Sequence, residues 1–409
     1  MSVTTAQGPH DIFTSAFFQD PYPTYRAMRE RDPVLELPFD LNLEQAQVIN
    51  ATGATTWMLT GHSAVSDALR DTDVFSSALP SPTGEPQTEL EQGRLVLINS
   101  DPPRHTALRH LINRAFNQRQ VAELEPMVRD MATRLVKSID SGVSVDLMPQ
   151  LCESLPIAVI AALLGVPVDL HQQFKTWSDA MIAAADPASL DQNLAKIIEL
   201  QAFFAGEVAD RRARPRDDMI SHLANARIED RPLEDWEAVS FCVLILLAGN
   251  ETTRNLLGCG LNVLADRPEL WSALRRDRSL IELFVEESLR FDSPVQVLNR
   301  WTKREVDFHG HVIPAFANVA VAYAAANRDP EVFRDPDEFV LDRPPGRHVA
   351  FAIGAHFCVG AWLARAEARL TFNALLDRFS TLERGEGAVV MQHHSRVVRG
   401  PAVLPLVLS

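Results

Sequence analysis

The chain has 409 residues, of which 46% are hydrophobic, and its formal net charge is −15 at pH 7. That length can bury a large core, and the acidic balance argues against general binding to nucleic acid or to anionic membranes. The four cysteines lie far apart without paired spacing, which argues against a disulfide framework and favours a reducing compartment. The first residues lack the pattern of a signal peptide, and the longest nearly apolar run, Phe241–Gly249, is too short to span a membrane. We therefore expect a soluble cytoplasmic protein and, on its size, an enzyme.

Helices dominate the elements that the sequence predicts. The first part of the chain should form a helix at Pro21–Arg31, a strand at Thr56–Leu59 and a mobile loop over residues 79–95. Helices should follow from Arg104 to about Asn225, then a long helix at Leu233–Asp266 and a helix at Glu269–Phe291. The last part should form strands at Val295–Thr302 and Val319–Tyr323, coil at Asp329–Arg347, a helix from about Gly360 to Phe379, and an extended tail at Val397–Leu408. The middle of the long helix is apolar nearly all round, so it should run through the interior. The prediction is a mainly α protein with a minor β part, an α+β class. Nothing marks a domain boundary, so we expect one domain over residues 1–409.

One cysteine stands in an unusual context. The stretch Phe351–Arg365 reads FAIGAHFCVGAWLAR and places Cys358 between Gly354 and Gly360. These glycines allow a tight turn and a close approach of the backbone to a flat ligand, and a helix that begins near Gly360 favours a thiolate at the sulfur. A lone thiolate suits zinc poorly and suits an iron that four ring nitrogens already hold. The alternative is an inert core cysteine, which this local context disfavours.

A second constellation interrupts the long helix. Residues 247–253 read LAGNETT, so the acid–alcohol pair Glu251–Thr252 lies in an otherwise apolar helix. Ala248 and Gly249 are small enough to leave space against a flat cofactor, and Thr252 can bond back to a carbonyl and loosen the helix. A carboxylate and a hydroxyl beside an apolar site can relay protons. The alternative is a Glu–Thr pair that faces solvent.

A third constellation is Glu287-Ser-Leu-Arg290, whose charged members share one helix face. Most such pairs are exposed and contribute little to stability. The apolar flanks indicate a buried helix here, and a buried pair needs further partners. Arg343 is the candidate third member.

Together these three elements resemble the cytochrome P-450 superfamily, and in particular its soluble bacterial members. The resemblance extends from about Pro21 to the end of the chain: FAIGAHFCVG resembles the heme-cysteine loop, AGNETT the oxygen-activating helix, and ESLR the structural Glu-x-x-Arg. Further matches are Asp101-Pro-Pro-Arg-His105 with Arg109, Arg211-Arg with Pro215-Arg-Asp-Asp218, Pro294-Val-Gln with Arg300, and Asn327-Arg-Asp-Pro330. The resemblance implies the cytochrome P-450 fold, a triangular helical body around a buried heme with small β-sheets.

The resemblance also implies residue roles. Cys358 would be the thiolate ligand of the iron in heme b (iron protoporphyrin IX), and Glu251 and Thr252 would deliver protons during oxygen activation. The residues that would contact the heme are His105, Arg109, Ala248, Arg300, Phe351, His356, Cys358 and Gly360. Among them His105, Arg109, Arg300 and His356 would hold the two propionates by charge-assisted bonds. Glu287, Arg290 and Arg343 would be structural.

The implied activity is that of a heme-thiolate monooxygenase, which hydroxylates or otherwise oxidises an apolar small molecule with O2. The residues that would line the substrate pocket are Leu244, Leu247, Ala248, Val295, Val297, Leu298, Val397 and Val398. Their apolar character favours a terpenoid, steroid, fatty acid or aromatic compound. The loop over residues 79–95 would close the pocket.

The chain contains no fused flavin or ferredoxin domain, so electrons would come from NAD(P)H through a separate ferredoxin and ferredoxin reductase. A basic face for an acidic ferredoxin is expected from Arg109, His110, Arg114, Arg119, Arg365 and Arg369. We expect a monomer that binds neither nucleic acid nor membrane. Two alternatives stay open: a peroxide-driven heme enzyme, which would need no proton relay, and a heme-binding sensor or docking protein without turnover.

Two positions depart from the family pattern. Ala352 stands where the family usually has a glycine, and alanine restricts the backbone there. Residues 36–55 are longer than the usual link into the first sheet. An extended hairpin or a lid could occupy them, and so could a neutral surface insertion.

Overall fold

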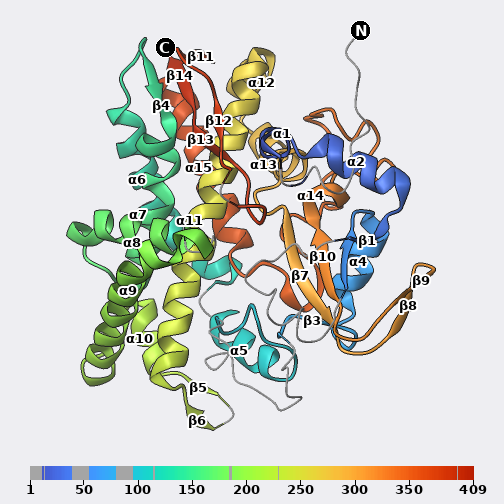
Figure 1. Cartoon of the computed structure of the whole chain (residues 1–409). Helices are drawn as coiled ribbons and strands as arrows, with labels where there is room; N and C mark the ends of the chain where they lie inside the picture. The colour runs from blue at the N-terminus through green and yellow to red at the C-terminus, as the bar shows by residue number, and fades with distance from the viewer. Residues whose placement is uncertain are drawn as a thin grey trace. The chain divides into compact units, whose positions relative to one another are not determined.

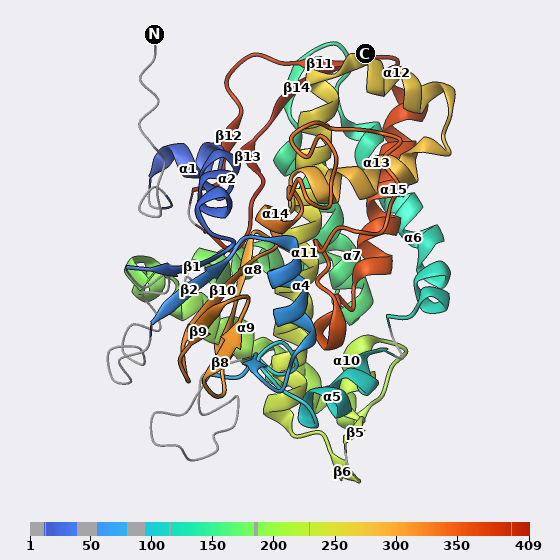
Figure 2. The same cartoon turned by 90° about the vertical axis from the view of Figure 1, so that its right-hand side faces the viewer.

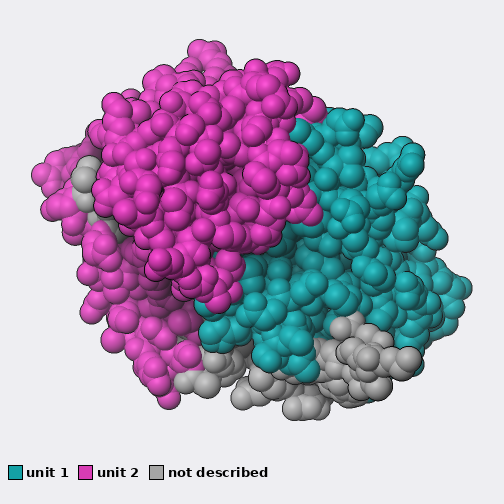
Figure 3. Space-filling model, turned by 90° about the horizontal axis from the view of Figure 1, so that it is seen from above, with its two compact units in different colours: residues 1–87, 286–358, 390–402 teal, residues 88–285, 359–389, 403–409 magenta. Residues whose placement is uncertain are grey.

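The structure, a computed structural model, describes residue 12 and residues 14–38, 55–79, 95–113, 116–183, 187–228, 230–393 and 395–409. The chain forms two compact units (Figure 3), which we call unit 1 (residues 1–87, 286–358 and 390–402) and unit 2 (residues 88–285, 359–389 and 403–409). Neither unit is one continuous stretch of sequence. The prediction of a single domain over residues 1–409 stays a prediction, and each unit is described by itself.

Unit 1 is built around a five-stranded sheet (Figure 1). Its strands, in the order in which they pair, are β1 (Val34–Leu37), β2 (Thr56–Leu59), β10 (Asn318–Ala322), β7 (Val297–Thr302) and β3 (Phe75–Ser76). Strands β2 and β10 are parallel and the other neighbours are antiparallel. The remaining elements of unit 1 are α1 (Ser15–Gln19), α2 (Tyr22–Arg31), α4 (His62–Arg70), β8 (Val306–Phe308), β9 (His311–Ile313), α14 (Tyr323–Ala326), the 3-10 turn Gly354–His356, β12 (Val390–Met391) and β13 (Pro401–Val403).

The central strands β2 and β10 are buried on both faces, and successive side chains of each strand point to opposite faces. Leu59 and Val319 join one apolar cluster with residues of α4, whereas Met58 and Ala320 join a second cluster with residues of α2. The alternation explains why β2 and β10 read as continuous apolar runs. The strand β7, which follows residues 295–296 in the chain, is held in the same sheet by its antiparallel pairing with β10.

Unit 2 is mainly helical. Its helices are α5 (Arg104–Asn113), α6 (Gln118–Ser138), a π-helical turn (Met148–Cys152), α7 (Ser154–Leu164), a 3-10 turn (Val168–Leu170), α8 (His171–Ala183), α9 (Pro187–Ala213), α10 (Met219–Ala224), α11 (Asp235–Asp266), α12 (Pro268–Arg276) and α15 (Ala361–Arg378), and α13 (Leu280–Phe291) leads from it into unit 1. A sheet of β11 (Leu382–Arg384), β14 (Pro405–Leu408) and β4 (Ser144–Asp146) and a hairpin of β5 (Arg227–Ile228) and β6 (Arg231–Pro232) complete it. The expected mainly α, α+β class is confirmed.

The long helix α11 is the axis of unit 2 and packs against α7, α9, α10 and α15 (Figure 2). It begins in a capping box, in which the Glu234 side chain accepts from the backbone of Glu237 and the Glu237 side chain accepts from the backbone of Glu234. It ends at Asp266, two residues before Pro268, which starts α12. Its 32 residues match the long helix that the sequence predicts.

One predicted element is wrong. A single helix was expected over Glu269–Phe291, but the chain forms α12 and α13 with a break between them. Asp277 ends α12 in an extended conformation, and its carboxylate accepts from both the backbone and the hydroxyl of Ser279. A local Asp–Ser turn of this kind competes with the helix ladder.

Two predicted segments fall mainly outside the described residues. Residues 80–94 of the predicted loop and residues 39–54 of the long 36–55 segment are not among them. The strands that flank the second segment are paired, since Leu37 lies opposite Thr56 in the antiparallel pair β1–β2. Within the described part of the chain, no helix is both long enough and apolar enough to cross a membrane.

Candidate active site

The loop before Cys358 is held in unit 1 by main-chain hydrogen bonds. The N–H of Cys358 donates to the carbonyl of Phe351 over 2.8 Å, and the N–H of Ala352 donates to the carbonyl of Val349 over 2.8 Å. The N–H of Val349 in turn donates to the side-chain oxygen of Asn327, 2.7 Å away. Cys358 is therefore presented by a closed backbone turn, three residues before α15 begins at Ala361.

Two residues of this loop have left-handed backbone conformations. Gly354 has φ +72°, and a Cβ there would meet the carbonyl oxygen of Leu69 at 2.7 Å, so only glycine fits. Ala352 has φ +55°, where an alanine carries a steric cost. Ala352, which stands where the family usually has a glycine, therefore has the left-handed backbone that favours glycine and carries a methyl group in addition. That side chain packs, partly buried, against the apolar cluster of β2 and α4.

Two further predicted heme contacts lie in unit 1. His356 Nε2 is 3.0 Å from Ser77 Oγ, which connects the loop to the chain just after β3. Arg300 lies on β7, is 6% exposed, and donates to the carbonyl of Asn299. Burial raises the pKa of Tyr323, and the positive charge of Arg300 opposes that shift. No carboxylate in the described part of the chain forms an ion pair with Arg300.

The structure brings Glu287, Arg290 and Arg343 together in unit 1. The Arg290 guanidinium forms a two-pronged pair with Glu287 at 2.8 and 2.7 Å, and Arg343 Nε lies 3.1 Å from both carboxylate oxygens. The N–H of Val340 also donates to this carboxylate. Arg290 further donates to the carbonyls of Asn327, Pro336 and Glu338. The cluster therefore fixes the coil that leads toward Cys358.

In unit 2 the acid–alcohol stretch lies in the middle of α11. Thr252 Oγ1 donates to the carbonyl of Ala248 over 2.6 Å, as the sequence predicts for this position. Ala248 is exposed within a helix whose neighbouring turns are buried. The small Gly249 has a different use from the one expected, because a Cβ there would lie 2.5 Å from the Ile160 side chain of α7. The absence of a side chain at Gly249 thus permits close packing of α7 against α11. The exposed small residue of α11, which we call the exposed step, is Ala248.

Glu251 is buried and held by charged and polar neighbours. Its Oε1 lies 3.3 Å from Arg254 Nη1 and 3.3 Å from Asn255 Nδ2. Arg254 Nε also donates to Glu153, which forms an ion pair with Lys175 of α8. Sequence reasoning missed Arg254 and Glu153. The spacing of Glu251 and Arg254 on one helix was a visible signal, whereas Glu153 lies about a hundred residues earlier.

The remaining predicted heme and pocket residues are distributed over both units. His105 is buried on α5 and Arg109 Nε donates to Asn113 on the same helix, so both lie in unit 2. The apolar pocket candidates of unit 2 are Leu244, Leu247 and Ala248, and those of unit 1 are Val295, Val297, Leu298, Val397 and Val398. Within unit 1 the two groups of valines meet, because Val295 and Val398 form an antiparallel bridge. Sequence reasoning also missed Arg399, whose N–H donates to the carbonyl of Pro294 beside this bridge.

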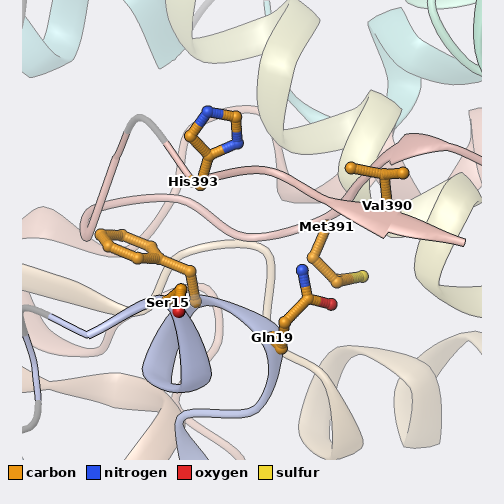
Figure 4. A pocket seen from close by; sticks show the side chains of 6 residues that line it. Ser15, Gln19, Val390, Met391 and His393 are labelled. Carbon is orange, nitrogen blue, oxygen red and sulfur yellow. The ribbon is translucent and has the colours of Figure 1, made fainter.

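A pocket of about 390 Å³ opens elsewhere in unit 1, between α1 and the strand β12 (Figure 4). It is lined by Ser15, Phe18, Gln19, Val390, Met391 and His393. None of the predicted substrate-pocket residues is among them.

The sequence and the fold of this chain are both similar to those of known proteins. The profile of the cytochrome P450 family matches residues 189–403. Vitamin D(3) 25-hydroxylase of Pseudonocardia autotrophica is 34% identical over an alignment of 412 residues, which covers 99% of this chain and 98% of the relative. Erythromycin C-12 hydroxylase of Saccharopolyspora erythraea is 36% identical over 361 residues, covering 86% of this chain and 88% of the relative.

Solved structures agree with the sequence relatives. Cytochrome P450 CYP109Q5 from Chondromyces apiculatus superimposes with a TM-score of 0.85 and 33% identity, covering 99% of both chains. The likeness in sequence and the likeness in fold thus extend over almost the whole chain, and they agree with the heme-cysteine loop, the acid–alcohol helix and the Glu-x-x-Arg cluster. This chain belongs to the cytochrome P450 family of heme-thiolate monooxygenases.

Proposed function

We propose that the chain inserts one oxygen atom of O2 into an apolar small molecule, with heme b as cofactor and Cys358 as its thiolate ligand. When bound, such a heme supplies redox chemistry at an iron atom to which the thiolate donates electron density. The chain itself binds and orients the heme and the substrate, and it delivers protons.

Residues of each unit suit a flat ring that carries two carboxylates. In unit 1 the buried Arg300 has no carboxylate partner within the described residues, and a buried cation without an anion is costly. A propionate would neutralise it through a charge-assisted bond. In unit 2 the exposed Ala248 leaves a small apolar step on α11, against which a flat ring fits. His105, Arg109 and His356 are the further propionate partners in this proposal.

The observation that carries the proposal is the bond from Thr252 to the carbonyl of Ala248, beside the buried Glu251. The bond orients the hydroxyl toward the exposed step of α11, and the hydroxyl oxygen can still accept a hydrogen bond from water. Adjacent helix residues point about 100° apart, so a water molecule is needed to link Glu251 to Thr252. Arg254 and Asn255 fix the carboxylate at one end of that path.

The substrate is an apolar small molecule, such as a terpenoid, steroid, fatty acid or aromatic compound. Support comes from the apolar character of all eight pocket candidates in the two units. The relatives' names, a vitamin D(3) hydroxylase and an erythromycin hydroxylase, support hydroxylation as the reaction type. The bridge between Val295 and Val398 makes two of the candidate segments one surface.

Electrons reach the heme from a separate acidic ferredoxin in this proposal. Its docking face is formed by basic residues of α5, α6 and α15, namely Arg109, His110, Arg119, Arg365 and Arg369; Arg114 lies outside the described residues. Arg119 and Arg369 also pair with Glu123 and Glu125 of α6. We test the docking face at Arg365, which lies on α15. Replacing Arg365 by Gln should raise the apparent KM for ferredoxin, more strongly at low salt than at high salt. No change at low salt would remove Arg365 from the docking face.

The test of the proposed function combines spectra and turnover. The reduced protein with CO should give the red-shifted Soret band of a thiolate-ligated heme. With ferredoxin, reductase and 18O2, the chain should incorporate one labelled oxygen atom into a product found by screening an apolar library. Turnover with peroxide alone, and none with the reductase system, would favour the peroxide-driven alternative.

A further inference from the structure

Two segments of unit 1 that carry predicted pocket valines are tied together by backbone bonds. Val295 bridges Val398, the N–H of Gln296 donates to the carbonyl of Val397 over 2.8 Å, and the N–H of Arg399 donates to the carbonyl of Pro294 over 2.9 Å. These bonds fix the register of the segments. Residues 295–296 are already placed, because they run into β7 and Val295 packs against the apolar cluster of β2 and α4, whereas residues 397–399 require an attachment of their own.

The side chain of Arg399 supplies that attachment. Its Nε donates to Asp292 Oδ1 over 2.8 Å, its Nη1 to the carbonyl of Phe18 over 2.8 Å, and its Nη2 to the carbonyl of Gln19 over 2.9 Å. The carboxylate stands just after α13, and the two carbonyls stand at the end of α1. One planar guanidinium therefore joins the residue beside Val398 to two separate helix ends. Phe18 and Gln19 also line the pocket between α1 and β12, so Arg399 bonds to two residues of the wall of that pocket.

The attachment is largely withdrawn from water. The Arg399 side chain is 11% exposed and the Asp292 side chain 12% exposed. Asp292 Oδ1 also accepts the hydroxyl of Tyr22 over 2.9 Å, and the Tyr22 oxygen accepts from the N–H of Ser293. Burial raises the pKa of Tyr22, so its hydroxyl stays a donor. Every member of this cluster therefore has its partner in a fixed direction.

We propose that Arg399 is a specificity-determining positioning residue, which sets where Val397 and Val398 stand at the substrate relative to Val295. The inference rests on the proposed function, because it takes these valines as pocket walls. Arginine is required because three donors in one plane reach three acceptors. A lysine keeps the charge and can keep the ion pair with Asp292, but its single nitrogen cannot hold both carbonyls of α1 in the same geometry. Val397 and Val398 would then shift relative to Val295 and to β7.

The test uses three probes that bind heme iron through an imidazole nitrogen and differ in size. Imidazole itself touches little of the pocket wall, 4-phenylimidazole touches part of it, and clotrimazole fills a large volume. Spectral titration of the holoenzyme measures each Kd for wild type and for Arg399→Lys. We expect the Kd for imidazole to stay within about twofold, and the ratio of the clotrimazole Kd to the imidazole Kd to change by about tenfold or more.

Arg29→Lys is the matched control. The Arg29 side chain is also 11% exposed, forms an ion pair with Asp329, and donates to the carbonyl of Ala325, and among the described residues no hydrogen bond or ion pair joins it to either valine segment. Both variants should lower the thermal midpoint, and only Arg399→Lys should change the ratio of Kd values. Equal ratios in wild type, Arg399→Lys and Arg29→Lys would overturn the inference.

A milder variant keeps the test valid if Arg399→Lys does not fold. Tyr22→Phe removes one bond to Asp292 and keeps the ring, and it should change the same ratio by about threefold. A folded Tyr22→Phe protein with the wild-type ratio would then count against the inference. The proposed function is tested separately by the incorporation of labelled oxygen in the wild-type protein: a protein that binds all three probes but incorporates no label from 18O2 would lose the proposed function, whereas equal Kd ratios in a protein that does incorporate it would overturn only the inference.

Discussion

The loop before Cys358 and the middle of α11 carry the two halves of the proposed chemistry, and they are built in different ways. In the loop, backbone N–H and carbonyl groups of residues 349–358 hold one another, and a left-handed residue closes the turn. In α11, a side-chain hydroxyl and a network of charged side chains fix Thr252 and Glu251 on a regular helix. The loop thus depends on shape, and the helix depends on side-chain chemistry.

This difference predicts how each region responds to substitution. Conservative changes of side chain in the loop should matter little unless they touch the sulfur or the backbone angles. In α11, by contrast, removing one atom that bonds or carries charge should alter function while the helix persists. Substitutions in each region test this contrast.

The largest effect is expected from Cys358→Ser. A serine oxygen is a poor substitute for a thiolate, so the red-shifted Soret band of the reduced CO complex should disappear completely. Cys242→Ala is the matched control, because Cys242 is fully buried and burial raises the pKa of its thiol, which keeps it neutral. The control should keep the band. A band that survives Cys358→Ser would refute Cys358 as the ligand.

Next in size is the loss of the cluster that supports the loop. Arg290→Met leaves the Glu287 carboxylate buried with Arg343 as its remaining cation, and it removes three bonds to carbonyls of the coil. The free energy of unfolding should fall by about 3–5 kcal/mol. Denaturant titration measures it. Arg26→Met breaks an exposed pair with Asp337 instead and should lower the free energy of unfolding by about 1 kcal/mol or less. Equal losses would contradict the distinction between buried and exposed pairs.

A third prediction concerns two buried carboxyl groups of unit 2. Glu251 has Arg254 and Asn255, whereas Glu367 on α15 is 1% exposed and its Oε2 has no hydrogen-bond partner within the described residues. Burial raises the pKa of Glu367 to about 8. Its ordinary value is about 4.3, so between these values the folded state holds a proton that the unfolded state releases. The free energy of unfolding should therefore fall as the pH rises from about 4.3 to about 8.

Glu367→Gln replaces the carboxyl group by an amide that does not titrate, so the variant lacks this pH-dependent contribution to the free energy of unfolding. The thermal midpoint of the variant, relative to wild type, should rise steadily between pH 5 and pH 8 and should be nearly equal to wild type at about pH 5. Calorimetry of both proteins across this range measures the difference. A difference that is constant with pH would mean that Glu367 does not hold a proton in the folded chain.

The fourth prediction tests the α11 side of the contrast. Thr252→Ala keeps a good helix former and removes the hydroxyl, so heme and substrate binding should persist while electrons end in hydrogen peroxide. The product formed per NAD(P)H should fall by about tenfold or more. Thr253→Ala, a change in the buried neighbour, should leave this ratio near the wild-type value. Unchanged coupling in Thr252→Ala would mean that another group relays the protons.

The sequence predicted the Cys358 loop and the helix α11 better than their supports, the contacts with distant residues that hold them in place. The limits of α11, the turn at Cys358 and the bond from Thr252 to Ala248 follow from local pattern, because they depend on residues close together in the chain. The supports join distant residues: Arg254 to Glu153, Arg399 to α1, and Ile160 to Gly249. No local spacing encodes such contacts. The break between α12 and α13 was local, but the apolar periodicity on either side concealed it.

The smallest expected effect isolates the backbone of the loop. Ala352 has φ +55°, so its Cβ crowds the backbone, and Ala352→Gly should relieve a cost of about 1 kcal/mol. The Cβ also packs against the apolar cluster of β2 and α4, and glycine loses that contact and gains entropy in the unfolded chain, so the net gain in the free energy of unfolding should be smaller still. The CO spectrum should not change, since the bond from the N–H of Cys358 to Phe351 uses main-chain atoms only. A loss of stability in Ala352→Gly would mean that the methyl packing outweighs the strain, and that the loop, too, depends on its side chains.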